Sequence, residues 1–485
     1  MSNGSGCARG PVPDERLTGS VGGESLQRPH SVQVALVKWL DERYPFSKSV
    51  ATELYRRVPN YAASMYHYLG GTIFLLIAIE FVTGFLLGLY YVPDGVGNPA
   101  PAYTSVNLIQ HEAYLGWLIR GVHFWGANLL IALVLLHMAR VWWTGAYRAP
   151  RELNWMVGVI MLLLILAIAI TGELLPWDTK SYLARGRELS ILSGDAVLPS
   201  GVSGFIKQLL QGGPTVGPST LLRFFMAHVF LLPAAMSLLM YVHFRFVRND
   251  GPAAPMLDTG QGDARTAGTG PGAPSPSESP LADNGPNTRP ALEPMFKRLR
   301  IGPGHVLYPM LAALALAGIL TGGPGRDLAA DMPEKDTHPY FPDQFWPYPI
   351  ITAATLILLG LLAASLQANL QLSAPADPRA VGIPRPDWYF LFLFQFLKLG
   401  PELITSLVVP LLAVIGLLFW PLLDTAIGPR VARRLGWKSW PVPGRNVIMQ
   451  SMFVAVIAAL GLLTFWALAG PEFCLPWFIN SPVCG

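Results

Sequence analysis

The sequence predicts an all-α polytopic membrane protein, and three observations lead to this fold class. Of its 485 residues, 52% are hydrophobic and only 13% are charged. The mean hydropathy is +0.40. Long runs nearly free of charge recur along the chain, and about 20 helical residues suffice to cross a ~30 Å hydrocarbon layer. Seven runs meet this requirement and are expected to span a membrane: 69–92, 121–143, 155–172, 224–246, 347–367, 403–425 and 447–469.

The residues before the first span set its orientation. Residues 1–32 are expected to form a disordered tail without a signal peptide, because they lack an apolar core. Residues 33–58 mix apolar and charged positions at helical spacing, which fits either a helix on the membrane surface or an ordinary solvated helix. Lys and Arg gather on one side if the spans alternate, so that side and the N-terminus are expected to be cytoplasmic, in an inner (plasma) membrane. The small net charge of +4 gives no reason to expect nucleic acid.

The composition divides the rest of the chain. A four-span region, 33–250, is followed by a Gly/Pro/Ser-rich linker over 251–300, which is expected to be disordered and cytoplasmic. Within 301–337 lies an apolar segment, 305–323, that contains a proline and is expected to be interfacial or re-entrant. A three-span region covers 338–470, and 471–485 form a tail on the outer face. Cys474 and Cys484 in this tail could form a disulfide or remain two thiols, and Cys7 is the third cysteine.

Four histidines lie in the second and fourth spans at matched spacing. His123 and His137 are 14 residues apart, close to four helical turns. His228 and His243 are 15 apart, which overshoots by about 60° but keeps one face. A single histidine on an apolar helix is usually a satisfied core residue, but four at hydrocarbon depth are costly without a partner. Paired imidazoles suit a six-coordinate haem, so we expect two stacked, non-covalent b-type haems.

Glycines and arginines accompany these histidines. Gly70 and Gly84 in the first span, like Gly158 and Gly172 in the third, are also 14 residues apart. Glycine lets a flat macrocycle approach the backbone, although small residues are common at membrane helix contacts. Three arginines lie close to the histidines and are expected to pair with haem propionates, the alternative being ordinary membrane-flanking charges: Arg120, Arg140 and Arg223.

These motifs resemble cytochrome b of the quinol-oxidising bc complexes. Residues 37–250 are similar to the b6-type subunit through "VTGFLLGLYY", "VHFWGANLLIALVLLHMARV", "TGELLPWD" and "GPSTLLRFFMAH". Residues 338–425 resemble subunit IV through "HPYFPDQF", "APADP" and "PDWYFLFLFQFLK", here fused to the first half. The resemblance implies that His123 and His228 hold a low-potential haem near the outer face. It assigns His137 and His243 to a high-potential haem near the cytoplasm.

The resemblance also implies an outer quinol-oxidation site. The family's Pro-Glu-Trp-Tyr motif is "PDWY" here, so Asp387 takes the place of the proton-accepting carboxylate, with Tyr389 beside it. An Asp that caps the following helix is the structural alternative. "LPWD" marks the facing side of the site. Glu173 stands where the family commonly has tyrosine, and we expect it to share proton uptake with Asp387.

Other residues depart from the family or have open roles. The b6f type binds an extra haem through a cysteine at the position of Tyr68, so that covalent haem is not expected. Glu80 is a further acid in the first span, either hydrogen-bonded or functional. Arg248 and Asp343 are candidates for a cytoplasmic quinone-reduction site, or else solvated charges at helix ends.

The expected function is that of a cytochrome b subunit. It would oxidise quinol at the outer site and pass electrons through two haems to a cytoplasmic-side quinone, with proton translocation. The expected partners are a Rieske iron–sulfur protein, a c-type cytochrome and a second copy of the chain. Two alternatives are a dihaem membrane anchor of a quinone-reactive dehydrogenase, which gives no reason for "PDWY" and "LPWD", and a haem-free transporter.

Overall fold

The structure is a computed structural model that describes residues 39, 42–43, 57–192, 199–251, 253, 333–382, 385–437 and 440–469. Several expectations therefore fall outside the described residues: the tail 1–32 with Cys7, nearly all of 33–58, nearly all of the linker 251–300, the segment 305–323, and the tail 471–485 with Cys474 and Cys484. The elements below all belong to one unit, Ser49–Gly485.

The regular structure of the described part is helical apart from one two-stranded ladder and an isolated bridge between Asp178 and Pro375, which confirms the predicted all-α membrane fold. Six helices among the described residues are long and apolar enough to cross a membrane. The elements of the first half are β1 (Arg57–Pro59), α3 (Met65–Gly88), α4 (Pro101–His111), α5 (Gly116–Trp143), α6 (Glu152–Glu173), α7 (Thr179–Leu192), α8 (Ser200–Leu210), α9 (Pro218–Met226), the π-helical turn η2 (Ala227–Leu231) and α10 (Leu232–Asp250).

The second half begins with β2 and adds helices on both sides of the first four. Its elements are β2 (Thr337–Pro339), the turn η5 (Tyr340–Gln344), α13 (Pro347–Ser365), η7 (Trp388–Phe390), α14 (Leu391–Phe396), η8 (Leu397–Leu399), η9 (Ile404–Val408), α15 (Val409–Leu418), α16 (Trp420–Arg434), η10 (Pro443–Arg445) and α17 (Val447–Ala469). Short 3-10 turns lie at Asn60–Ala63, Glu334–Asp336 and Gln367–Leu370.

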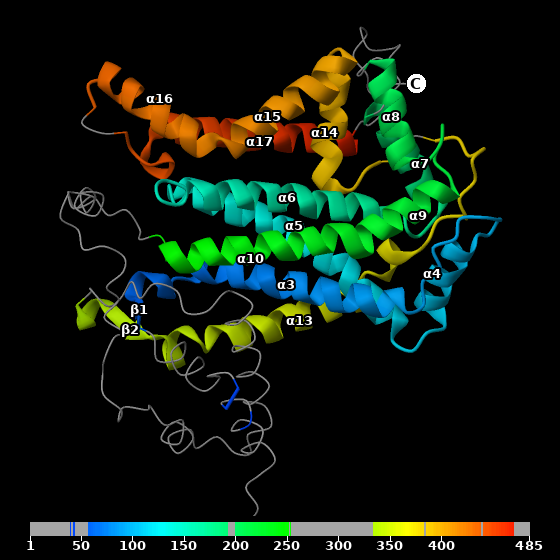
Figure 1. Cartoon of the computed structure of the whole chain (residues 1–485), viewed down its shortest axis with the longest axis horizontal. Coiled ribbons are helices and arrows are strands. Elements are labelled where there is room, and N and C mark those ends of the chain that lie inside the picture. The colour runs from blue at the N-terminus through cyan, green and yellow to red at the C-terminus, as the bar shows by residue number, and fades with distance from the viewer. Residues whose placement is uncertain are drawn as a thin grey trace, which may run out of the picture. The chain divides into compact units, whose positions relative to one another are not determined.

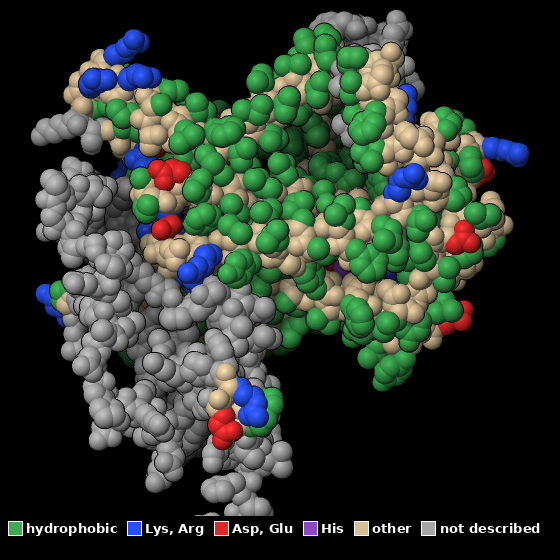
Figure 2. Space-filling view, in the orientation of Figure 1, with side chains coloured by type: hydrophobic (Ala, Val, Ile, Leu, Met, Phe, Trp, Pro, Cys, Tyr) green, Lys and Arg blue, Asp and Glu red, His purple; other side chains and the backbone are tan. Residues whose placement is uncertain are grey.

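Figure 1 shows how the helices of the two halves pack. Helices α3, α5, α6 and α10 lie side by side, with α13 against α3 and α5 and with α15 and α16 against α6. Their shared core contains Leu76, Ile131 and Met236, each no more than 1% exposed. Many outward side chains are hydrophobic, and Lys and Arg lie mainly toward the helix ends in this view (Figure 2). This distribution is that of a multi-pass membrane protein, whose outer helix faces contact lipid.

The two strands join the beginnings of the two halves. Strand β1, before α3, pairs antiparallel with β2, before α13, with Val58 opposite His338. The Arg57 guanidinium donates from Nε to Thr337 Oγ1 at 2.7 Å and from Nη2 to Thr337 O at 3.1 Å. Arg151, at the start of α6, donates to Asp250 O at 2.9 Å. His67, in the first turn of α3, hydrogen-bonds the backbone of Ala253, so α10 ends near the beginning of α3. Residues 253 and 333 therefore lie at the same end of the helices.

One expected span differs from its prediction. The run 403–425 was expected to be a single crossing helix, but α15 and α16 meet at an angle of 76°. Pro421 has no N–H for the carbonyl of Leu417, which a continuous helix would require. The Trp155 indole N–H donates to that carbonyl instead, at 2.7 Å. The chain therefore turns at Phe419 and continues as α16, whose last turn carries Arg433 and Arg434.

Candidate functional site

The four predicted histidines form two layers between α5 and the helix made of α9, η2 and α10. The rings of His123 and His228 are 6.3 Å apart between centroids. Two metal–nitrogen bonds of ~2 Å would separate the ring centres of a linear bis-imidazole complex by about 6.3 Å. His137 and His243 are close enough to interact electrostatically and form the second layer. We call the end with His123 and His228 the outer end and the opposite one the inner end.

A π-helical turn explains the unequal histidine spacings. His228 lies within η2, where the Leu232 N–H donates to Ala227 O, five residues earlier. Such a turn takes up one extra residue, so 15 residues from His228 to His243 advance about as far as the regular 14 from His123 to His137. The overshoot of about 60° expected from sequence is therefore removed. Pro233, at the start of α10, favours this turn because it cannot donate to the carbonyl four residues earlier.

Hydrogen bonds orient the imidazoles of the outer layer. Nδ1 of His123 lies 2.9 Å from Glu80 Oε2 and 2.9 Å from Thr83 Oγ1. Nδ1 of His228 lies 2.9 Å from Ile168 O and 3.3 Å from Thr171 Oγ1. In both rings Nδ1 therefore has an acceptor, which leaves the Nε2 lone pair for a ligand between the rings.

Each of the four predicted glycines lies against one of the four histidines. A Cβ at Gly84 would lie 3.2 Å from His123 Cε1, and one at Gly172 would lie 2.5 Å from His228 Cε1. At the inner layer the corresponding distances are 3.6 Å from Gly70 to His137 and 3.8 Å from Gly158 to His243. The outer glycines therefore leave room that a side chain would fill.

The two outer glycines belong to a repeated dipeptide whose meaning sequence reasoning missed. Thr83 precedes Gly84 and Thr171 precedes Gly172, and each threonine hydroxyl lies near the Nδ1 atom of the adjacent histidine. The recurrence of Thr-Gly at matching positions of the first and third spans was the available signal. This arrangement fits paired axial ligands, whereas no described group of three or more His, Cys, Asp or Glu is placed to hold a bare metal ion.

Glu80, whose role was open, is hydrogen-bonded to a histidine. Its Oε2 contacts His123, while its Oε1 is buried without a hydrogen-bond partner among the described residues. A Cβ at Gly126 would collide with Oε1, so this glycine of α5 makes room for the carboxylate. Glu80 therefore contacts the outer pair of histidines through its hydrogen bond with His123.

The "PDWY" segment contacts the middle of α5. The Trp388 indole donates to Asn128 Oδ1 at 2.8 Å, five residues beyond His123 in the chain. The Tyr389 hydroxyl donates to Asp387 Oδ2 at 3.0 Å. Asp387 stands at the N-cap position of η7 but makes no capping hydrogen bond with its side chain. The capping alternative therefore fails, and this carboxylate keeps acceptor capacity for another group.

Glu173 is paired with a basic residue that the sequence analysis did not single out. Its Oε2 lies 2.8 Å from Nη2 of Arg185, which also donates to Glu188 Oε1 at 2.7 Å. Both residues lie on α7, which follows the third predicted span and precedes the fourth. An Arg and a Glu three residues apart, just after "LPWD", were the available signal.

The aspartate of "LPWD" joins the two halves at the outer end. Asp178 Oδ1 accepts from the Ser181 N–H and Oδ2 accepts from the Ser373 N–H, both at 2.9 Å. Next to it, the Thr179 N–H donates to Ala374 O at 2.8 Å. Asp178 is 7% exposed and therefore has a structural role here.

The predicted arginines contact neutral groups in the described structure. Arg120 Nη1 donates to Gln110 Oε1 at 2.6 Å, Arg140 Nη2 lies 3.0 Å from His67 Nε2, and Arg223 Nη1 donates to Ser219 O at 3.2 Å. Their pairing with propionates stays a prediction. Arg248 lies in the last turn of α10 and Asp343 in η5. At the position of the family's cysteine, the Tyr68 ring packs edge-on against Tyr348 at 5.1 Å.

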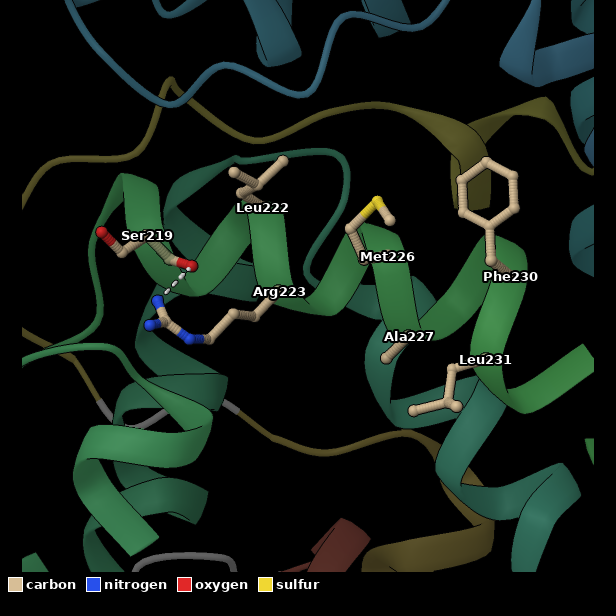
Figure 3. Close-up of a pocket in the computed structure, with 7 residues that line it drawn as sticks. All are labelled: Ser219, Leu222, Arg223, Met226, Ala227, Phe230 and Leu231. Atoms are coloured by element: carbon tan, nitrogen blue, oxygen red, sulfur yellow. Dashed lines mark hydrogen bonds between the residues drawn. The ribbon is translucent and has the colours of Figure 1, made fainter. Parts of the chain in front are cut away.

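Arg223 also lies at a groove on the surface of α9 and η2 (Figure 3). The groove measures about 710 Å³, and none of the four histidines lines it. Its other lining residues are Ser219, Leu222, Met226, Ala227, Phe230 and Leu231. Leu222, Met226 and Phe230 follow one another along one helix face, each about half exposed. The groove is thus apolar and lies outside the space between the imidazoles.

Comparison with known proteins assigns the first half to a sequence family. Residues 55–251 match the family model described as Cytochrome b/b6/petB. The menaquinol:cytochrome c reductase cytochrome b subunit of Geobacillus thermodenitrificans is 40% identical over 231 residues, which cover 46% of this chain and 98% of that protein. Cytochrome b6 of Heliomicrobium gestii is 39% identical over 222 residues, covering 45% of this chain and 100% of that protein.

A solved structure extends the likeness to the second half. A chain of a hyperthermophilic respiratory Complex III superposes with a TM-score of 0.65 over 90% of this chain and 92% of its own length, at 21% sequence identity. At this identity the match concerns the fold alone. The arrangement of both halves therefore occurs in a solved structure.

Proposed function

The chain belongs to the cytochrome b/b6 family, and from this premise we propose that it is the cytochrome b subunit of a quinol:cytochrome c, or similar, oxidoreductase. The relative from Geobacillus thermodenitrificans is named for a menaquinol:cytochrome c reductase. The observation that carries the proposal is the outer histidine pair, whose rings are separated as a bis-imidazole complex requires.

Four imidazoles would hold two b-type haems, His123 with His228 and His137 with His243. When bound, the haems supply one-electron carriers between the two ends of the helices. Glu80 and Ile168 O keep the outer rings in the tautomer that presents Nε2. Arg120, Arg140 and Arg223 are proposed to contact the propionates, and the four glycines to give the macrocycles space.

Asp387, Tyr389 and Glu173 would act on quinol at the outer end. Quinol oxidation releases two protons and two electrons, and a carboxylate near the quinol hydroxyl can accept a proton. Tyr389 holds Asp387 through its hydroxyl, and Glu173 offers a second carboxylate whose Oε1 is buried and unpaired among the described residues. One electron would go to a Rieske iron–sulfur partner and the other through the haems to a quinone at the inner end, where Arg248 is a candidate contact.

The remaining expectations complete this proposal. The iron–sulfur protein and a c-type cytochrome are the proposed partners, because the chain has only three cysteines and no CxxCH pattern. A homodimer, a cytoplasmic N-terminus and coupled proton translocation are proposed with them. We also propose that the chain consists of a dihaem region over 33–250, a linker over 251–300 and a region over 338–470 that carries the outer quinol motif.

The test is a redox titration of the reduced-minus-oxidised spectrum of the purified protein, with pyridine haemochrome quantification. Two b-type components of different midpoint potential are expected, and His228→Ala should remove one of them. A single component, or none, would refute the haem assignment. Quinol added to the whole complex should reduce these components. A haem-free protein would instead favour the transporter alternative.

The outer carboxylates have their own test. Asp387→Asn should slow quinol oxidation at least about tenfold, because the amide cannot accept the proton, while Asp387→Glu should retain most of the rate. Glu173→Gln should change the dependence of the rate on pH. If Glu173→Gln oxidises quinol as the wild type does at every pH, Glu173 has no part in proton uptake. Normal haem spectra in each variant would establish that the fold is intact.

A further inference from the structure

Three charged side chains form a cluster at the outer end of α6 and on α7. Arg185 stands between two carboxylates, with Glu173 Oε2 at 2.8 Å and Glu188 Oε1 at 2.7 Å from its Nη2. Nη1 of Arg185 contacts the second oxygen of Glu188. The two acids therefore share one guanidinium.

The cluster leads from the interior toward water. The side chain of Arg185 is 1% exposed, that of Glu173 is 14% exposed and that of Glu188 is 34% exposed. Asp387, in the "PDWY" segment, is near enough to act electrostatically on both glutamates. The cluster thus begins beside the proposed quinol site and ends at the surface.

Three polar atoms of the cluster are buried without a hydrogen bond among the described residues: Glu173 Oε1, Arg185 Nε and Arg185 Nη1, of which the last has the ion contact with Glu188. Buried polar atoms are nearly always hydrogen-bonded, so a small polar partner is expected here, such as water or the hydroxyl of a substrate. Because both carboxylates contact the same nitrogen, the gap between them is one that a single water molecule can span. A proton could therefore pass from Glu173 to Glu188 with little movement.

We propose that Glu188 is the proton exit of the outer quinol site. Glu173 takes a proton from a quinol hydroxyl, Glu188 receives it and releases it to the outer water, and Arg185 holds the two carboxylates in place. The second quinol proton leaves through Asp387. The two electrons go to the iron–sulfur partner and to the haem chain, so protons and electrons balance. This inference rests on the proposed function and adds to it a route that the known motifs do not contain.

The acidity of Glu188 supports this role. Burial raises the pKa of the Glu188 carboxyl to about 7, against the lowering effect of Arg185, and the carboxylates of Glu173 and Asp387 contribute further in the upward direction. A group with a pKa near the ambient pH both accepts and releases protons readily. Glu188 is therefore mostly protonated below about pH 7 and mostly free to accept above it.

The test is the pH dependence of haem reduction by quinol in the whole complex. The wild-type rate should rise through about pH 7, because only ionised Glu188 can receive a proton. Glu188→Gln should lose this rise, so that its rate is about tenfold lower than wild type near pH 8 and close to wild type near pH 5.5. Glu188→Asp should restore the rise. Glu112→Gln, which changes an exposed acid beside α4, should behave as the wild type.

The outcomes separate the relay from the function on which it rests. A wild-type pH profile in Glu188→Gln, with both haems bound, overturns the relay alone. A rate lowered equally at all pH values also overturns it, because that result indicates a structural role. If quinol fails to reduce the haems of the wild-type complex, the proposed function fails and the relay with it.

Discussion

Replacing Gly172 with alanine is expected to displace the His228 imidazole and weaken haem binding at the outer layer. A Cβ at position 172 would lie 2.5 Å from His228 Cε1 and 3.0 Å from Nδ1. Carbon atoms prefer about 3.5–4.0 Å, so the ring must move by roughly 1 Å. Overpacking of this kind costs about 1–3 kcal/mol. At about 1.4 kcal/mol per tenfold, the outer haem should bind roughly 5- to 150-fold more weakly.

The distance from an added Cβ to the neighbouring histidine differs among the four glycines, so the four alanine variants should differ in their effect on haem binding. Gly158→Ala would place its Cβ 3.8 Å from His243 Cε1, an ordinary contact that leaves the ring in place, so it should weaken haem binding less than Gly172→Ala does. Gly70→Ala, at 3.6 Å, should resemble it, whereas Gly84→Ala, at 3.2 Å, should be intermediate. The helical glycine Gly461 has no neighbour within 4 Å of its added Cβ. Gly461→Ala is therefore the matched control, and it should at most stabilise α17 by about 1 kcal/mol.

The assay is haem content per chain by pyridine haemochrome, together with potentiometric titration of the visible spectrum. Gly172→Ala should lose mainly the component that His228→Ala removes. If Gly172→Ala binds both haems at unchanged midpoint potentials, the reasoning from the Cβ contact is wrong. Equal losses in Gly158→Ala and Gly172→Ala would refute it as well, since only one of these side chains meets a close contact.

Two further predictions concern acids that contact other elements. Glu80→Gln should raise the midpoint potential of the outer haem, because an amide oxygen accepts the His123 Nδ1–H less strongly than a carboxylate and leaves the ligand less electron-rich. Potentiometry with Glu112→Gln as control measures this, and an unchanged midpoint would exclude the effect. Asp424 accepts from Tyr147, Arg148 and Trp440, so Asp424→Asn should lower stability in detergent by about 3–5 kcal/mol. Thermal unfolding measures this against Asp343→Asn, an exposed control expected to stay within about 0.5 kcal/mol.

The sequence predicted the helices and the histidines because membrane burial leaves few alternatives. Long apolar runs must be helical in lipid, and histidines there need partners, so spacing alone led to His123, His137, His228 and His243. The matching separation of 14 residues also pointed to the glycines of the first and third spans, but which histidine each glycine faces became known only from the structure. The expectation that "PDWY" and "LPWD" belong to one site rested on the family resemblance. Nothing in the spacing of the two motifs brings residues 178 and 387 together.

Three features could not be derived from periodicity. The π-helical turn at His228 depends on Pro233, whose effect on helix geometry can be a kink, a break or an added residue. The bend after α15 required both Pro421 and the distant Trp155 indole that satisfies the freed carbonyl. Arg185 was missed because a buried arginine between two spans is visible only once the tertiary contacts with Glu173 and Glu188 are known.

The joints between the two halves bear on how such a subunit can be encoded. Arg57 with Thr337, Trp155 with Leu417 and Asp178 with Ser373 connect them near both ends of the helices, and every one of these joints is a hydrogen bond. None depends on the stretch of chain between residues 253 and 333. Continuity of the polypeptide therefore contributes an effective concentration of one half around the other and a fixed one-to-one stoichiometry. Two separately translated fragments could assemble through the same joints, at the cost of having to find one another in the bilayer.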